Sequence, residues 1–163
     1  VQTKWLIKEI SNIEGPCYVR LCRLSTPIIY DENQKFEIGK MIQIGEGTDS
    51  TIFATGVTVS EALKAQEILK QRGINIRVID VHTIKPLDEE MILKCAKETK
   101  RLISIEDHSI LGGLGSAISE VLTERYPTRL ERMGIIDKFG KSGNAEELLK
   151  YFKIDCNSIV EKF

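Results

Sequence analysis

The sequence contains few of the residues that mark several large classes of protein. Its 163 residues include only four cysteines, two histidines, four prolines and one tryptophan. The cysteines form no C-x-x-C pair and the two histidines lie far apart, so the ligand spacing of a zinc site is missing. We therefore expect no metal site in this chain, and free thiols in a reducing compartment rather than a disulfide framework.

An excess of one charge is also missing. The 23 Lys and Arg residues are balanced by 24 Asp and Glu residues, which leaves a net charge of −1. This balance argues against a nucleic-acid partner and against a membrane surface, and no apolar run approaches the roughly 18 residues of a membrane span. The chain starts at Val1 without Met or a signal peptide, so we expect a fragment of a cytoplasmic protein.

Strand and helix patterns alternate from about residue 40 to the end. Runs rich in β-branched residues predict strands, and each is followed by a segment with apolar residues at helical spacing. Such alternation is typical of βαβ units. The sequence therefore predicts an α/β fold, a three-layer α/β/α sandwich with a mostly parallel sheet of about five strands. The strands expected in this region are 51–55, 74–81, 102–105 and 130–136.

Local signals predict where several helices begin and end. Thr58 and Glu61 have the spacing of a capping box, and Gly73 follows the expected helix as a stop signal. Three further side chains are expected to cap helices, namely Asp88, Asn144 and Asp155.

Residues 1–39 do not continue the alternating pattern. A short helix is expected around Trp5 and Ile10, a strand over 17–24, and a turn-rich stretch over 25–39. One helix and one strand cannot bury a core alone. We expect this remnant helix and strand to be the tail of a preceding domain, joined by a linker to a complete domain over 40–163.

Gly112-Gly113-Leu114-Gly115-Ser116 follows a strand and opens a helix, so its backbone amides are a candidate cradle for a nucleotide or another anion. The dinucleotide fingerprint is incomplete because residue 118 is Ile. The favoured alternative is a tight turn that lets the helix pack closely.

Three other segments carry candidate chemistry. His108, at the end of a strand, is a candidate acid or base, and Lys85 is a candidate anion ligand. Arg20 and Arg23 carry the guanidinium group suited to phosphate. From the residues alone, a structural or solvent-exposed role is favoured for each of them. No nucleophile–base pair is visible near His108, and the turn at Lys85 is explained by Asp88, which is expected to cap the next helix.

Several stretches taken together resemble the C-terminal region of transketolase-type thiamine diphosphate enzymes. Five motifs occur in the family's order and span most of the chain. They are Phe36–Lys40, Thr51–Gly56, His82–Asp88 (HTIKPLD), Glu106–Ser116 (EDHSILGGLGS) and Asp137–Gly143 (DKFGKSG). The split type, which is encoded as two subunits, is the form that the chain resembles most. His82-Thr83-Ile84 and Gly140-Lys141-Ser142-Gly143 favour transketolase over its relatives, which usually carry Arg at the position of His82.

The resemblance implies a domain organisation and a function. Residues 1–39 would be the tail of the pyrimidine-binding domain plus a linker, and 40–163 the transketolase C-terminal domain. The full enzyme would transfer a two-carbon ketol unit between sugar phosphates, using thiamine diphosphate and a divalent metal such as Mg. Its partners would be the N-terminal transketolase subunit or domains and a second copy in a dimer.

The resemblance leaves little of the catalytic machinery to this chain. The family's Gly-Asp-Gly cofactor motif and the activating Glu are missing from the sequence, so we expect no catalytic, cofactor-binding or metal residue here and an inactive isolated fragment. The family places a substrate-phosphate Arg just after the last strand of the pyrimidine domain, and Arg23 matches that position. The alternative is the C-terminal domain of 1-deoxyxylulose-5-phosphate synthase or of a 2-oxo-acid dehydrogenase β subunit, acting as a docking module.

Overall fold

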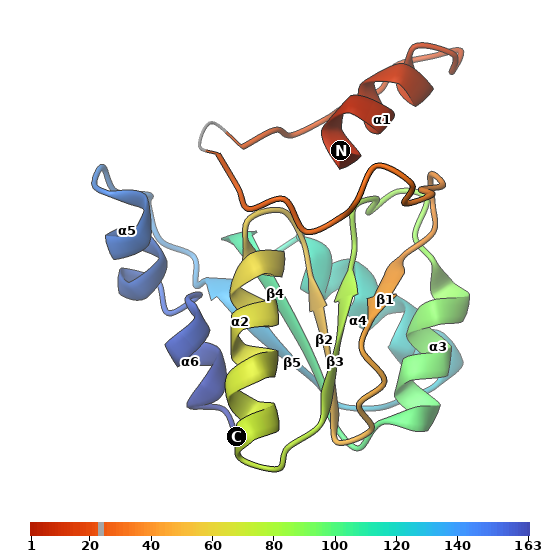
Figure 1. Ribbon diagram of the computed structural model, residues 1–163. Helices are drawn as coiled ribbons and strands as arrows, with labels where there is room; N and C mark the ends of the chain where they lie inside the picture. The colour runs from red at the N-terminus through yellow and green to blue at the C-terminus, as the bar shows by residue number, and fades with distance from the viewer. Residues whose placement is uncertain (23–24) are drawn as a thin grey trace.

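Five strands form one sheet in the order β1-β3-β2-β4-β5 (Figure 1). The computed structural model describes residues 1–22 and 25–163. The strands are β1 (Ile42–Ile44), β2 (Ser50–Ala54), β3 (Ile76–Asp80), β4 (Leu102–Ser109) and β5 (Leu130–Ile135). The helices are α1 (Gln2–Ile10), α2 (Thr58–Gln71), α3 (Glu89–Glu98), α4 (Leu114–Arg125), α5 (Ala145–Tyr151) and α6 (Cys156–Val160).

The central strands pair in parallel because a helix connects each one to the next. β2 pairs in parallel with both β3 and β4, and β4 pairs in parallel with β5. Every residue of β2 and β3 is buried, as expected of strands covered on both faces. The sequence predicted this α/β class and the mostly parallel five-stranded sheet.

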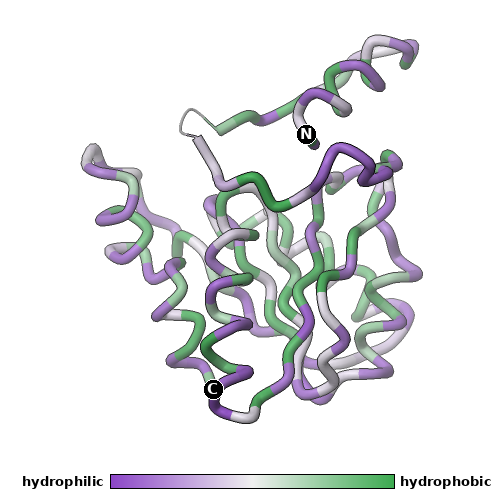
Figure 2. Tube along the Cα trace, in the orientation of Figure 1, coloured by the Kyte–Doolittle hydropathy of each residue, from purple (hydrophilic) through white to green (hydrophobic). Residues whose placement is uncertain are grey.

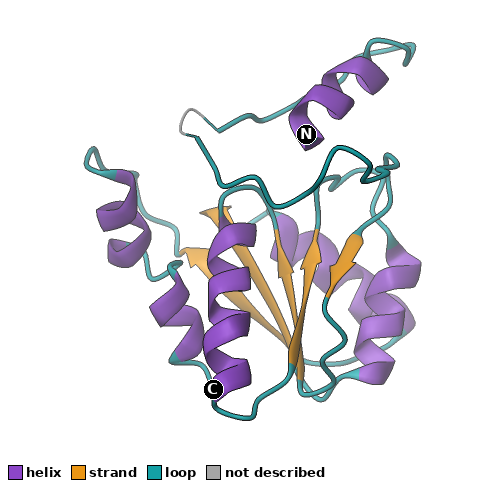
Figure 3. Ribbon diagram, in the orientation of Figure 1, coloured by secondary structure: helices purple, strands orange, loops and turns teal. Residues whose placement is uncertain are grey.

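Helices cover both faces of the sheet and complete a three-layer sandwich (Figure 3). On one face α2 packs beside α6, and the apolar core there includes Ile52, Leu69 and Ile159. On the other face α3 packs beside α4, with Phe53 and Ile118 in the core. Apolar residues accordingly gather on the strands and the inward sides of the helices (Figure 2).

Two details differ from the sequence-based expectation. β1 was not predicted, because three residues are too few to show a periodic pattern; it pairs antiparallel with β3, with Ile42 opposite Asp80. The strand expected over 17–24 is wrong for its described part: residues 17–22 run outside any strand, and 23–24 lie outside the described residues. Residues that favour strands form one only where the surrounding structure offers a strand to pair with, and none of the described strands pairs with 17–22.

The chain before residue 38 crosses the edge of the sheet at which β2 and β3 end (Figure 1). We call its described residues, 1–22 and 25–37, the N-terminal strap. It begins with α1, the expected short helix, and continues as an irregular chain. In the described residues, no helix is long and apolar enough to span a membrane.

Candidate functional site

A cavity of about 320 Å³ lies between the N-terminal strap and the ends of β2 and β3. Its floor includes the turn over 55–57, Asp80 and His82, and its roof includes the beginning of α1 and residues 26–30. In open α/β sheets, ligands characteristically bind at the carboxyl ends of parallel strands. This edge is therefore where a functional site is expected, and here a segment of the chain itself covers it.

Asp80 is the polar centre of this cavity. It ends β3 and is only 1% exposed. One of its carboxylate oxygens, Oδ2, accepts hydrogen bonds from the Tyr30 hydroxyl at 2.6 Å and from the Gln2 side-chain amide at 2.8 Å. Burial, and then the neighbouring Asp80 carboxylate, raise the pKa of Tyr30 well above its ordinary value. The buried carboxylate thus ties two separate parts of the strap to one strand end.

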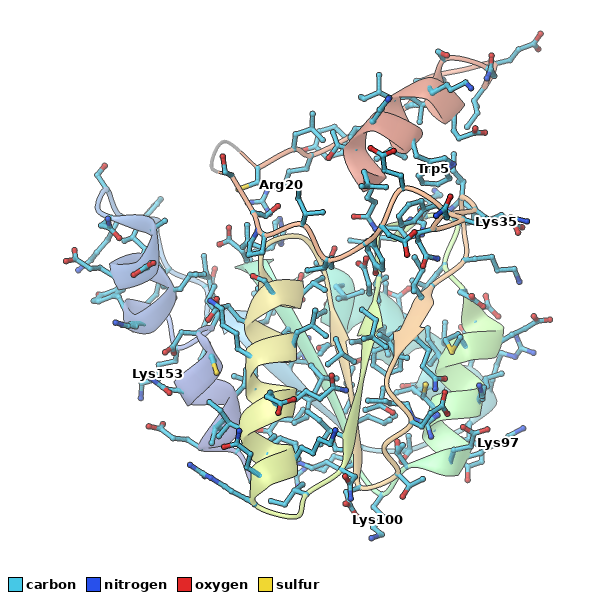
Figure 4. The ribbon with its side chains drawn as sticks, in the orientation of Figure 1. Trp5, Arg20, Lys35, Lys97, Lys100 and Lys153 are labelled. Atoms are coloured by element: carbon cyan, nitrogen blue, oxygen red, sulfur yellow. The ribbon has the colours of Figure 1, made fainter. Side chains whose placement is uncertain are left out.

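His82 lies two residues farther along and contacts the strap through aromatic rings. Its ring centroid is 5.5 Å from that of Trp5 and 6.0 Å from that of Phe36, both edge-on. Trp5 also packs on Phe36 at 5.2 Å, and Phe36 on Tyr30 at 5.1 Å. Figure 4 shows Trp5 where α1 approaches the edge of the sheet. We call His82, Trp5, Phe36 and Tyr30 the aromatic cluster.

The two nitrogens of His82 have different surroundings. Nδ1 lies 2.8 Å from the Thr83 hydroxyl, while Nε2 is buried and has no hydrogen-bond partner among the described residues. Burial lowers the pKa of His82 below its usual value, and the negative charge of Asp80 opposes this effect. The neutral imidazole is therefore the form that suits the cluster.

Arg20 makes a third connection between the strap and the sheet edge. Its guanidinium donates a hydrogen bond of 2.7 Å to the backbone oxygen of Asp107 and lies 3.5 Å from the Asp107 carboxylate. Figure 4 shows Arg20 on the strap above this end of the sheet. The second arginine singled out from the sequence, Arg23, lies outside the described residues.

The glycine turn at 112–116 does not offer its amides to a ligand. The buried carboxylate of Glu106 accepts hydrogen bonds from the amides of Leu114 at 2.7 Å and Gly115 at 2.9 Å. A Cβ on Gly115 would lie 2.7 Å from the Ser104 hydroxyl, so glycine allows α4 to approach β4 closely. The structural alternative is the one that forms: a tight turn filled by a side chain of the protein. Sequence reasoning did not anticipate the role of Glu106.

The other candidates are solvent-exposed or structural. His108 is half exposed, and its Nδ1 lies 2.9 Å from the Ser109 backbone oxygen. Lys85 is exposed in the turn before α3. Asp88 caps that helix by accepting from the Met91 amide at 3.1 Å, as its sequence position predicted.

The donor groups of the described residues do not fit a thiamine diphosphate–metal site. In 1–22 and 25–163, no group of three or more His, Cys, Asp or Glu side chains converges as metal ligands do. The α4 N-terminus, which could otherwise hold a phosphate group, is filled by Glu106.

Comparison with known proteins then assigns the fold to a family. The model of the transketolase C-terminal domain family matches residues 39–159. The chain belongs to the transketolase family. The match contains four of the five sequence motifs in full and ends shortly before the end of α6.

Relatives within the transketolase family are similar along nearly the whole chain. A protein of Methanocaldococcus jannaschii with the provisional name of a transketolase C-terminal section is 47% identical over 98% of this chain and 51% of its own length. A 6-deoxy-6-sulfo-D-fructose transketolase subunit of a Clostridium species is 44% identical over 98% of this chain and 49% of its own length.

A solved structure agrees with the sequence relatives. It is described as a split gene transketolase, an inactive β4 tetramer, and has a TM-score of 0.93 with 38% sequence identity. The match covers 98% of this chain and 52% of that one. The chain thus spans about half the length of the transketolase relatives it matches, and its fold, strap included, is that of this structure.

Proposed function

We propose that this chain is the C-terminal part of a split-type transketolase and that its share of the enzyme is structural, in docking and in support of a dimer. The complete enzyme would be a transferase that moves a two-carbon ketol unit between sugar phosphates in the cytoplasm, as in the pentose phosphate pathway. The observation that carries the proposal is the transketolase C-terminal match over 39–159 in a chain whose glycine turn is filled by its own Glu106.

The proposal includes a division of the chain near residue 39. Residues 1–39 would be the tail of the pyrimidine-binding domain with its linker, and 40–163 the C-terminal domain. Two features support this: the alternating elements begin only with β1, and the strap contacts the sheet through a few side chains. Arg23 keeps its proposed role as a ligand of the substrate phosphate.

Thiamine diphosphate and Mg would then be bound by other parts of the enzyme. The partners would be the N-terminal transketolase subunit or domains and a further copy of the C-terminal subunit. Several exposed apolar side chains support contact with such partners, since large apolar groups in water favour association. Among them are Tyr18 at 90%, Ile28 at 85% and Phe139 at 98% exposure.

Reconstitution tests the proposal. The chain is mixed with the N-terminal subunit of a split transketolase and with a pyrimidine-binding segment, and ketol transfer from a ketose phosphate to an aldose phosphate is measured. We expect activity only in the complete mixture, with no turnover and no thiamine diphosphate binding by the chain alone. Tight binding of thiamine diphosphate to the isolated chain in calorimetry would contradict the proposal, as would full activity of the mixture without it.

A further inference from the structure

The N-terminal strap is joined to the α/β domain at few points. Among the described residues, three strap side chains hydrogen-bond to the domain, those of Gln2, Arg20 and Tyr30. Within the described chain, one backbone hydrogen bond joins the two, from the Lys40 amide to the Glu37 oxygen in the turn where the strap meets the domain. The cavity of about 320 Å³ is lined by part of the strap, residues 26–30 included, and by the domain. The aromatic cluster is therefore a large part of what holds the strap in place.

We propose that His82 makes this contact an acid-released latch, in which the strap is docked while the imidazole is neutral and detaches when it becomes protonated. The latch is a property of the chain's own residues and does not depend on the proposed function. Its geometric basis is a histidine enclosed by Trp5 and Phe36, both from the strap, with a buried Nε2 that has no partner in the described structure.

Protonation of His82 would give the ring a positive charge and place an N–H on Nε2, which has no hydrogen-bond acceptor among the described residues. Leaving a buried charged donor without a hydrogen bond is costly, whereas an unpartnered neutral nitrogen costs much less. Detachment of α1 and Phe36 would expose the ring to water and remove this cost. The strap can move away without breaking the sheet, since it contributes no strand to it.

Other charged groups around the cluster modify this balance. From β3, Asp80 favours the protonated ring, but its Oδ2 already accepts from Gln2 and from Tyr30. Glu9, one turn after Trp5 on α1, is half-buried. The other charged residues near the cluster in sequence are exposed: Lys4, Lys8, Lys35, Glu37 and Lys85.

The direction of the pH effect follows from burial. Burial lowers the pKa of His82 in the docked state, more than Asp80 raises it. The docking free energy from the neutral ring is therefore fully present above about pH 6.5, the ordinary histidine value, and is lost as the pH falls toward the docked-state pKa. Between these two values, each unit by which the pH falls raises the ratio of released to docked strap by up to about tenfold.

Trp5 reports the position of the strap directly because it is the single tryptophan of the chain. Its emission maximum and its quenching by acrylamide are measured from pH 8 to pH 5, with circular dichroism to verify that the α/β domain stays folded. We expect a red shift and stronger quenching below about pH 6.5. A loss of intensity at an unchanged emission maximum, or no change at all with the domain folded, would overturn the proposal.

Two substitutions locate the effect, and the chain offers a matched control. His82→Gln cannot be protonated and should abolish the transition, whereas His108→Gln removes the only other histidine and should leave it intact. If His82→Gln already releases the strap at pH 8, His82→Phe keeps an aromatic ring in the cluster and should stay docked at both pH values. A transition with an unchanged midpoint in His82→Gln or in His82→Phe would refute the latch.

Discussion

Replacing Glu106 by Gln should destabilise the domain strongly, although the change is nearly isosteric. The carboxylate is 1% exposed and accepts two amide hydrogen bonds at the start of α4. A hydrogen bond to a charged group contributes about 1.5–3 kcal/mol, and a negative charge at a helix N-terminus adds about 0.3–2 kcal/mol. Gln keeps one acceptor oxygen but turns an NH₂ group toward the second amide. We expect a loss of roughly 2–4 kcal/mol in the free energy of unfolding.

Urea unfolding followed by circular dichroism measures this loss. With a slope of about 2 kcal/mol per molar urea, typical of small domains, the midpoint should fall by roughly 1–2 M. Glu120→Gln, on the exposed side of the same helix, is the control and should change stability by less than about 0.5 kcal/mol. If Glu106→Gln behaves like this control, the carboxylate does not fill the glycine turn in the way argued. Gly113→Ala is an independent probe, because its Cβ would lie 2.0 Å from the Glu106 carboxylate.

Two further predictions concern other carboxylates. Asp88→Ala should cost about 1–3 kcal/mol in the free energy of unfolding, because the side chain caps α3 and also accepts from the Met41 amide at 3.0 Å; thermal unfolding measures the loss, and an unchanged midpoint would contradict it. Hydrogen bonds from Lys162 and Arg101 lower the pKa of Glu131 in the folded state. The ionised Glu131 carboxylate therefore stabilises the fold above the unfolded-state pKa of about 4.3, and this stabilisation is lost as the pH falls below that value. In Glu131→Gln, stability should therefore fall less steeply between about pH 5 and pH 3 than in the unaltered chain. Urea midpoints measured at each pH test this, and an equally steep fall in both proteins would argue against the ion pair.

Local signals predicted the elements whose determinants lie close together in the sequence. Asp88, Asn144 and Asp155 each cap the helix that follows, as predicted. Gly73 adopts a positive φ of 77° directly after Arg72, the C-cap residue of α2. These positions need only neighbouring backbone amides or a backbone free of a Cβ, so a single sequence is enough to identify them.

Partners distant in the sequence explain the failures. The capping box expected from Thr58 and Glu61 is wrong, because α2 has no side-chain cap. Thr58 instead donates to backbone oxygens of Thr55 and Ile105, and Glu61 accepts from the amide of Cys156 at the start of α6. Tertiary contacts of this kind override a local pattern, and nothing in the spacing of the residues reveals them.

The candidate site could be predicted only in part, because its residues are also distant in the sequence. His82 was identified by its motif, but Asp80 and Tyr30 were not singled out at all. Asp is rarely buried, so an aspartate that ends an apolar strand was the one sequence feature that could have pointed to Asp80. Its partners lie 50 and 78 positions away in the strap, which no pattern in a single sequence brings together.

The carboxyl edge of the sheet shows how this domain differs from α/β proteins that bind ligands there. At the end of β3, Asp80 holds the strap, and at the end of β4, Glu106 fills the turn before α4 while Asp107 holds Arg20. The carboxylates at these strand ends are thus bound to groups of the chain itself. The edge of the sheet at which ligands bind in other α/β proteins here holds the N-terminal strap. Such an arrangement is suited to fixing one part of an enzyme against another. This use of the edge favours the proposed assembly role over a separate ligand site in the domain.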